Sequence, residues 1–242
     1  MDIFNSWIVN KYIAHRGFHD ENNPENSLGA FKKAIEHDYV IELDVRVIED
    51  GTPVVFHDET LKRLTGQDGY IRHIKNTEEL KKFNLLNTNE KIPTLQEVLD
   101  FVNCSTPILI EIKDFNLNSY FEKAVYELLK NYKGDYAIMS FNPNTLKWFK
   151  ENAPNVIRGQ LASFFKGEKL SFIKKFLLKR MVFNKKVSPH FIAYKWDEVP
   201  NRFVKKYKNL PLLVWAVPSQ QAYMKVAKHC DNIIFENFEP RI

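Results

Sequence analysis

Long hydrophobic runs are absent from this chain of 242 residues. A helix that crosses a bilayer needs about twenty consecutive apolar residues, and no run here approaches that length. Residues 1–7 also lack the basic and apolar regions of a secretion signal. The sequence therefore predicts a cytoplasmic protein without a membrane-spanning helix.

Cysteine is scarce, with only Cys104 and Cys230 in the whole chain. Two isolated thiols are too few for a thiolate zinc site, and they argue against redox chemistry. We expect both to be buried, reduced thiols that behave as small apolar side chains.

Charge and composition limit which partners are expected and how large the core can be. A net charge of +5 suits an anionic substrate, but no nucleic-acid-binding motif accompanies it, so we expect no nucleic-acid partner. A hydrophobic content of 44% over this length is enough for one large core. We expect a single domain over residues 1–242, while the oligomeric state stays open.

Short β-rich runs alternate with helical patterns, which is typical of parallel α/β proteins. The expected strands are Tyr12–Arg16, Val40–Val47, Pro53–His57, Ile108–Lys113, Tyr136–Ser140, Val156–Leu161, Phe191–Lys195, Leu212–Val217 and Asn232–Phe235. Asp50-Gly51 predicts a hairpin that makes Pro53–His57 antiparallel. The other runs match the eight parallel strands of a TIM (β/α)8 barrel, which is the predicted fold.

Helix patterns occupy the segments between these strands. Ser27–Glu36 has apolar residues at helical spacing, and Thr94-Leu95-Gln96-Glu97 matches a capping box. Residues 59–93 hold little more than a short helix near Thr77–Phe83, so we interpret them as a small excursion over the barrel mouth.

Acidic side chains stand on two of the expected strands. Strand alternation puts Glu42 and Asp44 on one face, and buried paired carboxylates need a cation if both are to stay ionised. Glu111 and Lys113 share a face of a later strand. Three carboxylates without clustered cysteines favour a hard ion, Mg²⁺ or Ca²⁺, over zinc.

Two histidines accompany these acids, in His15-Arg16-Gly17 and His57-Asp58. Gly17 permits a break in the strand that lets His15 and Arg16 both face the site. Arg16 can fork onto a phosphate, and Lys113 adds a point charge. Each residue alone is more often structural, but together they favour a metal-assisted phosphodiesterase site.

Residues 167–186 mix apolar and basic side chains in an amphipathic pattern. Such a segment can lie on an anionic membrane, but a barrel also needs covering helices with lysines beside an apolar stripe. We favour the covering helix and keep peripheral membrane contact as a hypothesis.

The chain resembles the glycerophosphodiester phosphodiesterases, relatives of the phosphatidylinositol-specific phospholipases C. The motifs that carry the resemblance are Ile13-Ala14-His15-Arg16-Gly17, Pro24-Glu25-Asn26-Ser27, Ile41-Glu42-Leu43-Asp44-Val45, Asp50-Gly51, Val54-Val55-Phe56-His57-Asp58, Leu61-Lys62-Arg63-Leu64-Thr65-Gly66, Ile92-Pro93-Thr94-Leu95-Gln96-Glu97-Val98-Leu99 and Ile110-Glu111-Ile112-Lys113, with weaker echoes at Ser140-Phe141 and Trp215-Ala216-Val217. The resemblance implies a TIM barrel that uses Mg²⁺ or Ca²⁺. It also implies hydrolysis of glycerophosphocholine or glycerophosphoethanolamine to glycerol 3-phosphate and an alcohol.

When the family's roles are assigned to the matching positions of this sequence, the resemblance implies that His15 and His57 are the acid–base pair. The implied metal ligands are Glu42, Asp44 and Glu111. The implied mechanism has the glycerol 2-hydroxyl attack phosphorus, giving a cyclic phosphate that water opens. We favour His57 as the acid for the leaving group and His15 as the base, although the sequence does not order these roles.

Substrate contacts and specificity are less determined by the resemblance. Phe141 and Trp215 are candidates for the substrate pocket, with a core role about as frequent for barrel aromatics. Residues 215–218 and 235–237 depart from the family pattern, which leaves the head group open. The alternatives are a lysophospholipase D or phospholipase C type enzyme at a membrane surface, and an inactive barrel that binds phosphodiesters; the intact histidines and acids argue against the latter.

Overall fold

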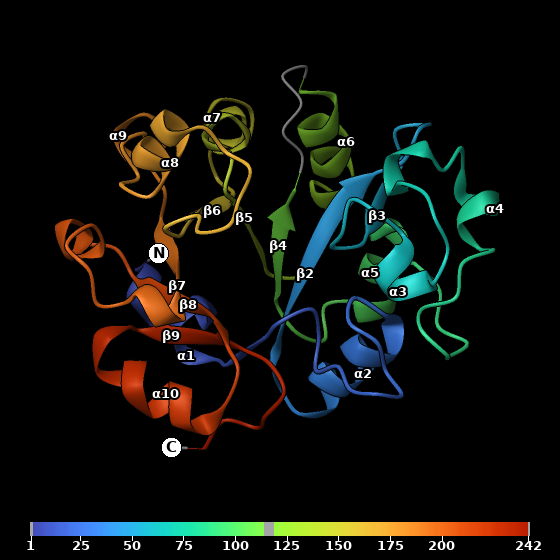
Figure 1. Cartoon of the computed structure of the whole chain (residues 1–242), viewed down its shortest axis with the longest axis horizontal. Coiled ribbons are helices and arrows are strands. Elements are labelled where there is room, and N and C mark those ends of the chain that lie inside the picture. The colour runs from blue at the N-terminus through green and yellow to red at the C-terminus, as the bar shows by residue number, and fades with distance from the viewer. Residues whose placement is uncertain (1, 114–118, 242) are drawn as a thin grey trace. The chain divides into compact units, whose positions relative to one another are not determined.

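The computed structural model describes residues 2–113 and 119–241, which form two compact units. We call Ala14–Tyr136 the N-terminal unit and Ala137–Ile242, together with Met1–Ile13, the C-terminal unit. Figure 1 shows the elements of each.

In the N-terminal unit, β2 (Val40–Val47) pairs in parallel with β4 (Ile108–Ile112) and antiparallel with β3 (Pro53–Val55). The hairpin predicted between β2 and β3 is present, and Gly51 adopts a positive φ of 88° in its turn. The helices of this unit are α2 (Leu28–Glu36), α3 (Lys62–Thr65), α4 (Thr77–Leu80), α5 (Leu95–Val102) and α6 (Tyr120–Leu129), with the 3₁₀ turn η2 (Ile71–His73).

Local capping sets where two of these helices begin. The Ser27 hydroxyl accepts a hydrogen bond from the Ala30 amide ahead of α2. Thr94 and Glu97 form the predicted capping box at the start of α5. Both helices then bury their apolar faces, so the sequence pattern and the packing agree.

The excursion after β3 packs on the β2–β3 hairpin and builds a small core of its own. Its buried residues are Ile48, Val54, Phe56, Leu61, Leu64, Ile71, Ile74, Leu80, Phe83, Leu85 and Ile92. Helix α4 ends at Leu80, three residues before the expected Phe83. Because this core holds α3 in place, α3 can present side chains next to the strand ends.

In the C-terminal unit, β5 (Tyr136–Ser140), β6 (Ile157–Ala162), β7 (Phe191–Lys195), β8 (Leu212–Val217) and β9 (Asn232–Phe235) pair in parallel in that order. Its helices are α1 (Trp7–Asn10), α7 (Pro143–Asn152), α8 (Phe172–Leu178), α9 (Asn184–Val187) and α10 (Gln220–Val226). The 3₁₀ turns are η1 (Ile3–Asn5), η3 (Trp196–Glu198), η4 (Val204–Tyr207) and η5 (Ala227–His229). The Asn232 amide donates to the carbonyls of Ile8 and Lys11, which fastens the segment after α1 to β9.

Strands β1 (Ile13–Ala14), β2 and β4 to β9 alternate with helices along the chain, and the chain has the predicted TIM (β/α)8 fold class with β3 as an addition. The strand expected over Tyr12–Arg16 is shorter than predicted. It ends at Ala14 because Arg16 and Gly17 adopt left-handed φ values of 57° and 81°. No helix among the described residues is long and apolar enough to cross a bilayer.

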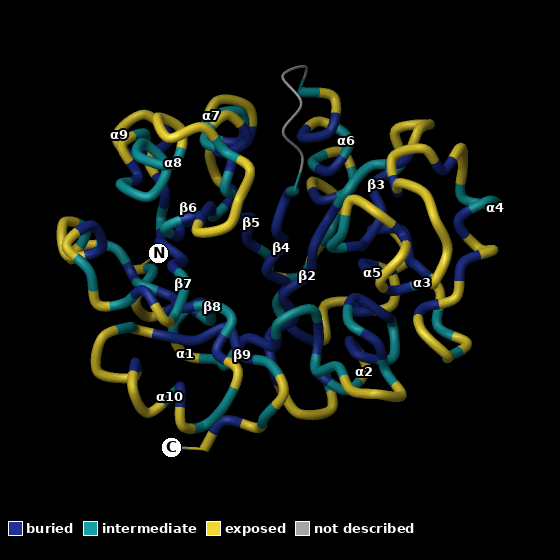
Figure 2. Tube along the Cα trace, in the orientation of Figure 1, coloured by how far each residue is buried: buried dark blue, intermediate teal, exposed yellow. Residues whose placement is uncertain are grey.

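One expectation about burial was wrong, and another was met only in part. Cys104 is exposed at the surface and Cys230 is half-buried, so these thiols are not the two core residues that their type suggested. Helix α8 covers its unit only in part: Phe172 and Ile173 are exposed, Phe176 is half-buried, and Met181 after the helix is buried (Figure 2).

Candidate active site

Three acidic side chains gather on neighbouring strands of the N-terminal unit. Asp44 on β2 lies directly across from Glu111 on β4 in the parallel register, and Glu42 stands on the same face of β2. One carboxylate oxygen of each lies within 4.8 Å of the others, and all three residues are buried. The cluster predicted from strand alternation is therefore present.

Basic groups surround Asp44. The Lys113 Nζ lies 3.2 Å from Asp44 Oδ1 and 2.8 Å from Glu111 Oε1, while Arg16 Nε lies 3.2 Å from Asp44 Oδ2. Burial raises the pKa of Asp44, but Lys113, His57 and Arg16 outweigh it and hold the pKa well below its usual range. Asp44 is thus ionised at neutral pH.

Glu42 sits in the opposite electrostatic setting. Its Oε2 accepts the backbone N–H of Arg16 at 2.9 Å, but within the described part of the chain its buried Oε1 has no hydrogen-bond partner. Burial, followed by the charges of Asp44 and Glu111, raises the pKa of Glu42. A buried carboxylate oxygen without a partner, aimed at two further acids, fits a bound cation, because the ion would supply the missing charge.

The loop after β1 brings Arg16 to this cluster. Gly17 bends the chain, and its amide donates to the carbonyls of Ala14 and Glu42. A Cβ at Gly17 would come within 2.9 Å of Ala30 and Phe31, so only glycine fits there. The strand break predicted at this position is therefore real and lets Arg16 face the acids.

His57 follows β3 and lies beside the acid cluster. Its Nδ1 donates to Asp58 Oδ1 at 2.7 Å, and the amide of Phe56 donates to the Asp44 carbonyl. Burial lowers the pKa of His57 more than the charge of Asp44 and the hydrogen bond with Asp58 raise it. Its Nε2 is then the ring atom left to exchange a proton.

A chain of charged side chains links His57 to Arg16. Arg63 on α3 donates to Asp58 at 2.7 and 2.9 Å and to Glu25 at 2.7 and 2.8 Å. Glu25 in turn accepts from Arg16 Nη1 at 2.6 Å. Burial raises the pKa of Glu25, but Arg63 and Arg16 outweigh it and lower the pKa to about 2.

Part of this chain of contacts escaped sequence reasoning. Asp58, Arg63 and Asn26 lie in the motifs that carry the family resemblance, but the sequence assigned no role in the site to any of them. In the structure, the Asn26 side chain donates to Asp44 Oδ2 at 2.9 Å and accepts the Asp44 amide at 3.2 Å. The signal that could have found Asp58 is its place next to a histidine, since a carboxylate often orients an imidazole.

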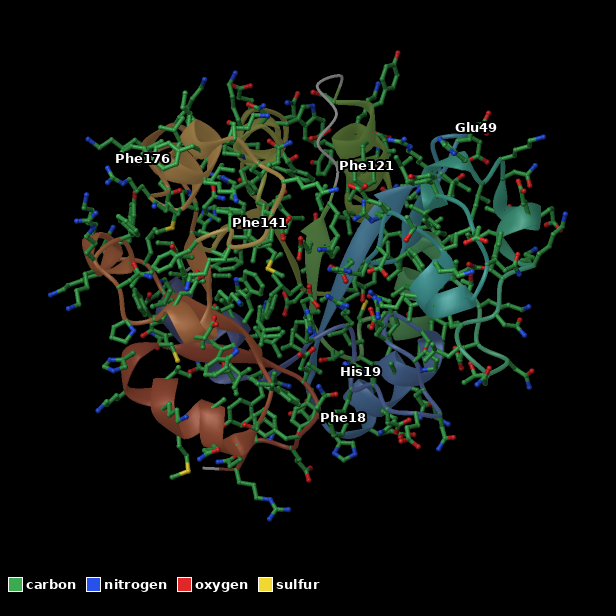
Figure 3. All side chains as sticks on the ribbon, in the orientation of Figure 1. Phe18, His19, Glu49, Phe121, Phe141 and Phe176 are labelled. Atoms are coloured by element: carbon green, nitrogen blue, oxygen red, sulfur yellow. The ribbon has the colours of Figure 1, made fainter. Side chains whose placement is uncertain are left out.

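His15 is half-buried in the loop after β1 and lies within electrostatic reach of Asp44, near the acids. Phe141 and Trp215 belong to the C-terminal unit, where their rings meet edge to face with centroids 5.5 Å apart (Figure 3 labels Phe141). The described structure therefore brings seven of the predicted site residues together in the N-terminal unit, while the two aromatic residues contact each other in the C-terminal unit.

Comparisons with known proteins give the family. The model of the glycerophosphoryl diester phosphodiesterase family matches residues 15–238. A glycerophosphodiester phosphodiesterase of Caldanaerobacter subterraneus subsp. tengcongensis is 37% identical over 160 residues, which cover 62% of this chain and 65% of that protein. The lysophospholipase D GDPD1 of Homo sapiens is 35% identical over 162 residues, which cover 60% of this chain and 50% of that protein.

Solved structures agree on the fold. A glycerophosphodiester phosphodiesterase from Thermotoga maritima matches with a TM-score of 0.70 and 30% identity, over 93% of each chain. A phosphodiesterase from Oleispira antarctica, solved with the product sn-glycerol-3-phosphate, matches with a TM-score of 0.79 and 24% identity, over 95% of this chain and 93% of that one. The family match spans nearly all of the sequence, and this chain belongs to the glycerophosphoryl diester phosphodiesterase family.

Proposed function

We propose that this chain hydrolyses glycerophosphodiesters to glycerol 3-phosphate and an alcohol. The observation that carries the proposal is the cluster of Glu42, Asp44 and Glu111 beside His57 and Arg16. Family membership and the product bound to the Oleispira antarctica enzyme support it. The single domain and the cytoplasmic location stay predictions, and the oligomeric state stays open.

Glu42, Asp44 and Glu111 would hold one divalent cation, Mg²⁺ or Ca²⁺. All their donor atoms are carboxylate oxygens, which hard cations prefer. When bound, the cation supplies positive charge for the phosphodiester oxygens. The cation-binding role of these three residues is supported by Glu42 Oε1, which has no hydrogen-bond partner among the described residues.

His57 and His15 would move the protons. The Asp58 carboxylate holds the Nδ1–H of His57, so Nε2 of that ring is directed to exchange a proton with the substrate. His15 would serve as the second group of the acid–base pair. Which ring is acid and which is base in the first step stays a prediction, with His57 favoured as the acid from the sequence.

Arg16 and Lys113 would bind the phosphate. Both lie against the acid cluster, and both pKa values are raised: burial lowers each, but Asp44 and other nearby carboxylates outweigh it. Phe141 and Trp215 would contact the organic part of the substrate. In the described residues, the buried indole N–H of Trp215 has no acceptor, as expected for a group that donates to a ligand.

The test is turnover of purified protein with glycerophosphocholine, lysophosphatidylcholine and an aryl phosphodiester, each with Mg²⁺, Ca²⁺ or chelator. We expect glycerol 3-phosphate from the first substrate and loss of turnover with chelator. Substitutions His57→Ala and His15→Ala should each lower turnover by roughly 10²–10⁴-fold. His229→Ala, at an exposed histidine, is the matched control. Turnover within a few-fold of wild type in both site variants contradicts the acid–base pairing.

A lysophospholipase D activity is the second candidate. The human relative bears that name, and the match covers half of its length. Release of choline from lysophosphatidylcholine, rather than from glycerophosphocholine, would favour this candidate. A protein that turns over neither compound but binds glycerol 3-phosphate would be the inactive barrel instead.

A further inference from the structure

Helix α8 carries large apolar side chains that face solvent. Phe172 and Ile173 are 79% and 69% exposed, and Val182 in the following turn is 44% exposed. Figure 2 colours the whole of α8 as exposed or half-buried. Large apolar side chains at such exposure, clustered in one segment, mark a surface that meets a partner.

The segment is nevertheless held to its unit at its C-terminal end. Met181 packs into a cluster with residues of β6, β7 and η4, and its carbonyl accepts the Tyr207 hydroxyl at 2.9 Å. The Tyr194 hydroxyl donates to the Lys179 carbonyl at 3.1 Å. The exposed side chains of Phe172 and Ile173 are therefore presented from an anchored helix.

Helical spacing puts the apolar side chains on one stripe. Phe172 and Phe176 are one turn apart, with ring centroids separated by 6.4 Å, and Ile173 and Leu177 continue the stripe. Arg180 lies over the Phe176 ring at 3.7 Å. Apolar side chains and cationic heads thus share this surface, which Figure 3 marks at Phe176.

The charge around α8 is predominantly positive. Eight basic residues and one acid, Glu168, lie between residues 166 and 186. The net positive charge of this segment is therefore larger than the +5 of the whole chain. The basic residues are Lys166, Lys169, Lys174, Lys175, Lys179, Arg180, Lys185 and Lys186. None of them forms an ion pair with an acidic residue in the described structure.

We propose that this α8 surface, residues 166–186, docks on an anionic lipid bilayer. Phe172 and Ile173 would enter the boundary between head groups and acyl chains, while the lysines flanking the stripe would contact acidic head groups. A second copy of this chain is disfavoured as occupant, because two surfaces of the same strong charge repel each other. An anionic bilayer complements both the apolar stripe and the charge.

The experiment is co-sedimentation of the full chain with phosphatidylcholine vesicles, with and without phosphatidylglycerol, at low salt. We expect binding to the anionic vesicles only, weakened by salt. The double substitution Phe172→Ser with Ile173→Ser should weaken binding by roughly tenfold or more. Met224→Ser is the matched control, because Met224 is 72% exposed on α10 outside this surface.

Charge reversal gives a second variant pair. Lys174→Glu with Lys175→Glu should also weaken binding by more than tenfold, since each basic residue near an anionic surface contributes roughly fivefold. Lys205→Glu with Lys206→Glu, at exposed positions of η4, should have the smaller effect. Unchanged circular dichroism would show that the variants fold.

Three results would overturn the proposal. They are absence of wild-type binding, equal binding of the α8 and control variants, and equal binding to neutral vesicles. A concentration-dependent dimer that the Phe172→Ser and Ile173→Ser changes abolish would assign the surface to a second copy instead. The assay measures binding without turnover, so failed docking and failed hydrolysis are separate results.

Discussion

At the scale of single residues, Gly17 is the position where backbone geometry most directly shapes the site. Its φ of 81° and the 2.9 Å that would separate an added Cβ from Ala30 leave no room for a side chain. We expect Gly17→Ala to lower the free energy of unfolding by about 1–3 kcal/mol, because both strain and overlap oppose it. Urea unfolding measures this.

Gly51 is the matched control for that substitution. It has a similar φ of 88°, but a Cβ there meets nothing within 4 Å. Gly51→Ala should therefore show the backbone strain alone and be the less destabilising change. Equal losses in the two variants would mean that crowding at Ala30 and Phe31 adds nothing.

Glu25 gives a pH-dependent prediction. Burial raises its pKa, but Arg63 and Arg16 lower it from 4.5 to about 2. A folded-state pKa below the unfolded one stabilises the protein above the unfolded pKa, and this stabilisation is lost as the pH falls through about 2. The stability difference between wild type and Glu25→Gln should thus shrink from pH 6 to pH 2. Denaturant unfolding at several pH values checks this, and a constant difference would contradict it.

At the scale of elements, α3 and the β2–β3 hairpin act on the site together. Arg63 on α3 bonds Asp58, which orients His57, and Glu25, which holds Arg16. Arg63→Ala should lower kcat by about 10- to 100-fold with little change in cation affinity, as is usual for groups that orient site residues. Steady-state kinetics over a cation titration separates the two effects.

Two further variants test whether the planar, two-sided hydrogen bonding of the Arg63 guanidinium matters. Arg63→Lys keeps the charge but cannot bond two carboxylates in parallel, so it should recover only part of the lost kcat. Lys62→Ala, the neighbour on α3, breaks only an exposed ion pair with Asp68 and should leave kcat unchanged. Full recovery of kcat in Arg63→Lys would show that only the positive charge of Arg63 matters.

Elements with strong local signals were predicted well. The strands Val40–Val47, Tyr136–Ser140, Phe191–Lys195, Leu212–Val217 and Asn232–Phe235 have the expected bounds. The hairpin and the capping box were also confirmed. The covering role expected of residues 167–186 was met only in part, because an amphipathic pattern shows that an apolar stripe exists but not how much of it the fold buries.

At the scale of the molecule, bound cation should raise stability. Only the folded chain brings Glu42, Asp44 and Glu111 within 4.8 Å, so cation binding is linked to folding. A cation at about a hundred times its Kd adds about 2.7 kcal/mol to the free energy of unfolding. Melting of chelated protein with and without Mg²⁺ or Ca²⁺ measures the shift.

Variants assign that stabilisation to the cluster. Glu42→Gln and Glu111→Gln should remove most of the cation-dependent rise in Tm, since each loses a charged ligand. Glu49→Gln changes an exposed glutamate, labelled in Figure 3, and should retain the rise. A rise of equal size in all three variants would place the bound cation elsewhere.

The sequence by itself determined the strands, the turns and the faces on which Glu42, Asp44 and Glu111 stand, because these depend on periodicity and on residues close along the chain. The tertiary structure decided which distant side chains meet. Arg63 and Glu25 are 38 positions apart, and their contact forms only when the excursion packs on the hairpin. It also decided that Cys104 and the side chains of Phe172 and Ile173 stay exposed, since burial depends on what the rest of the chain places over a residue.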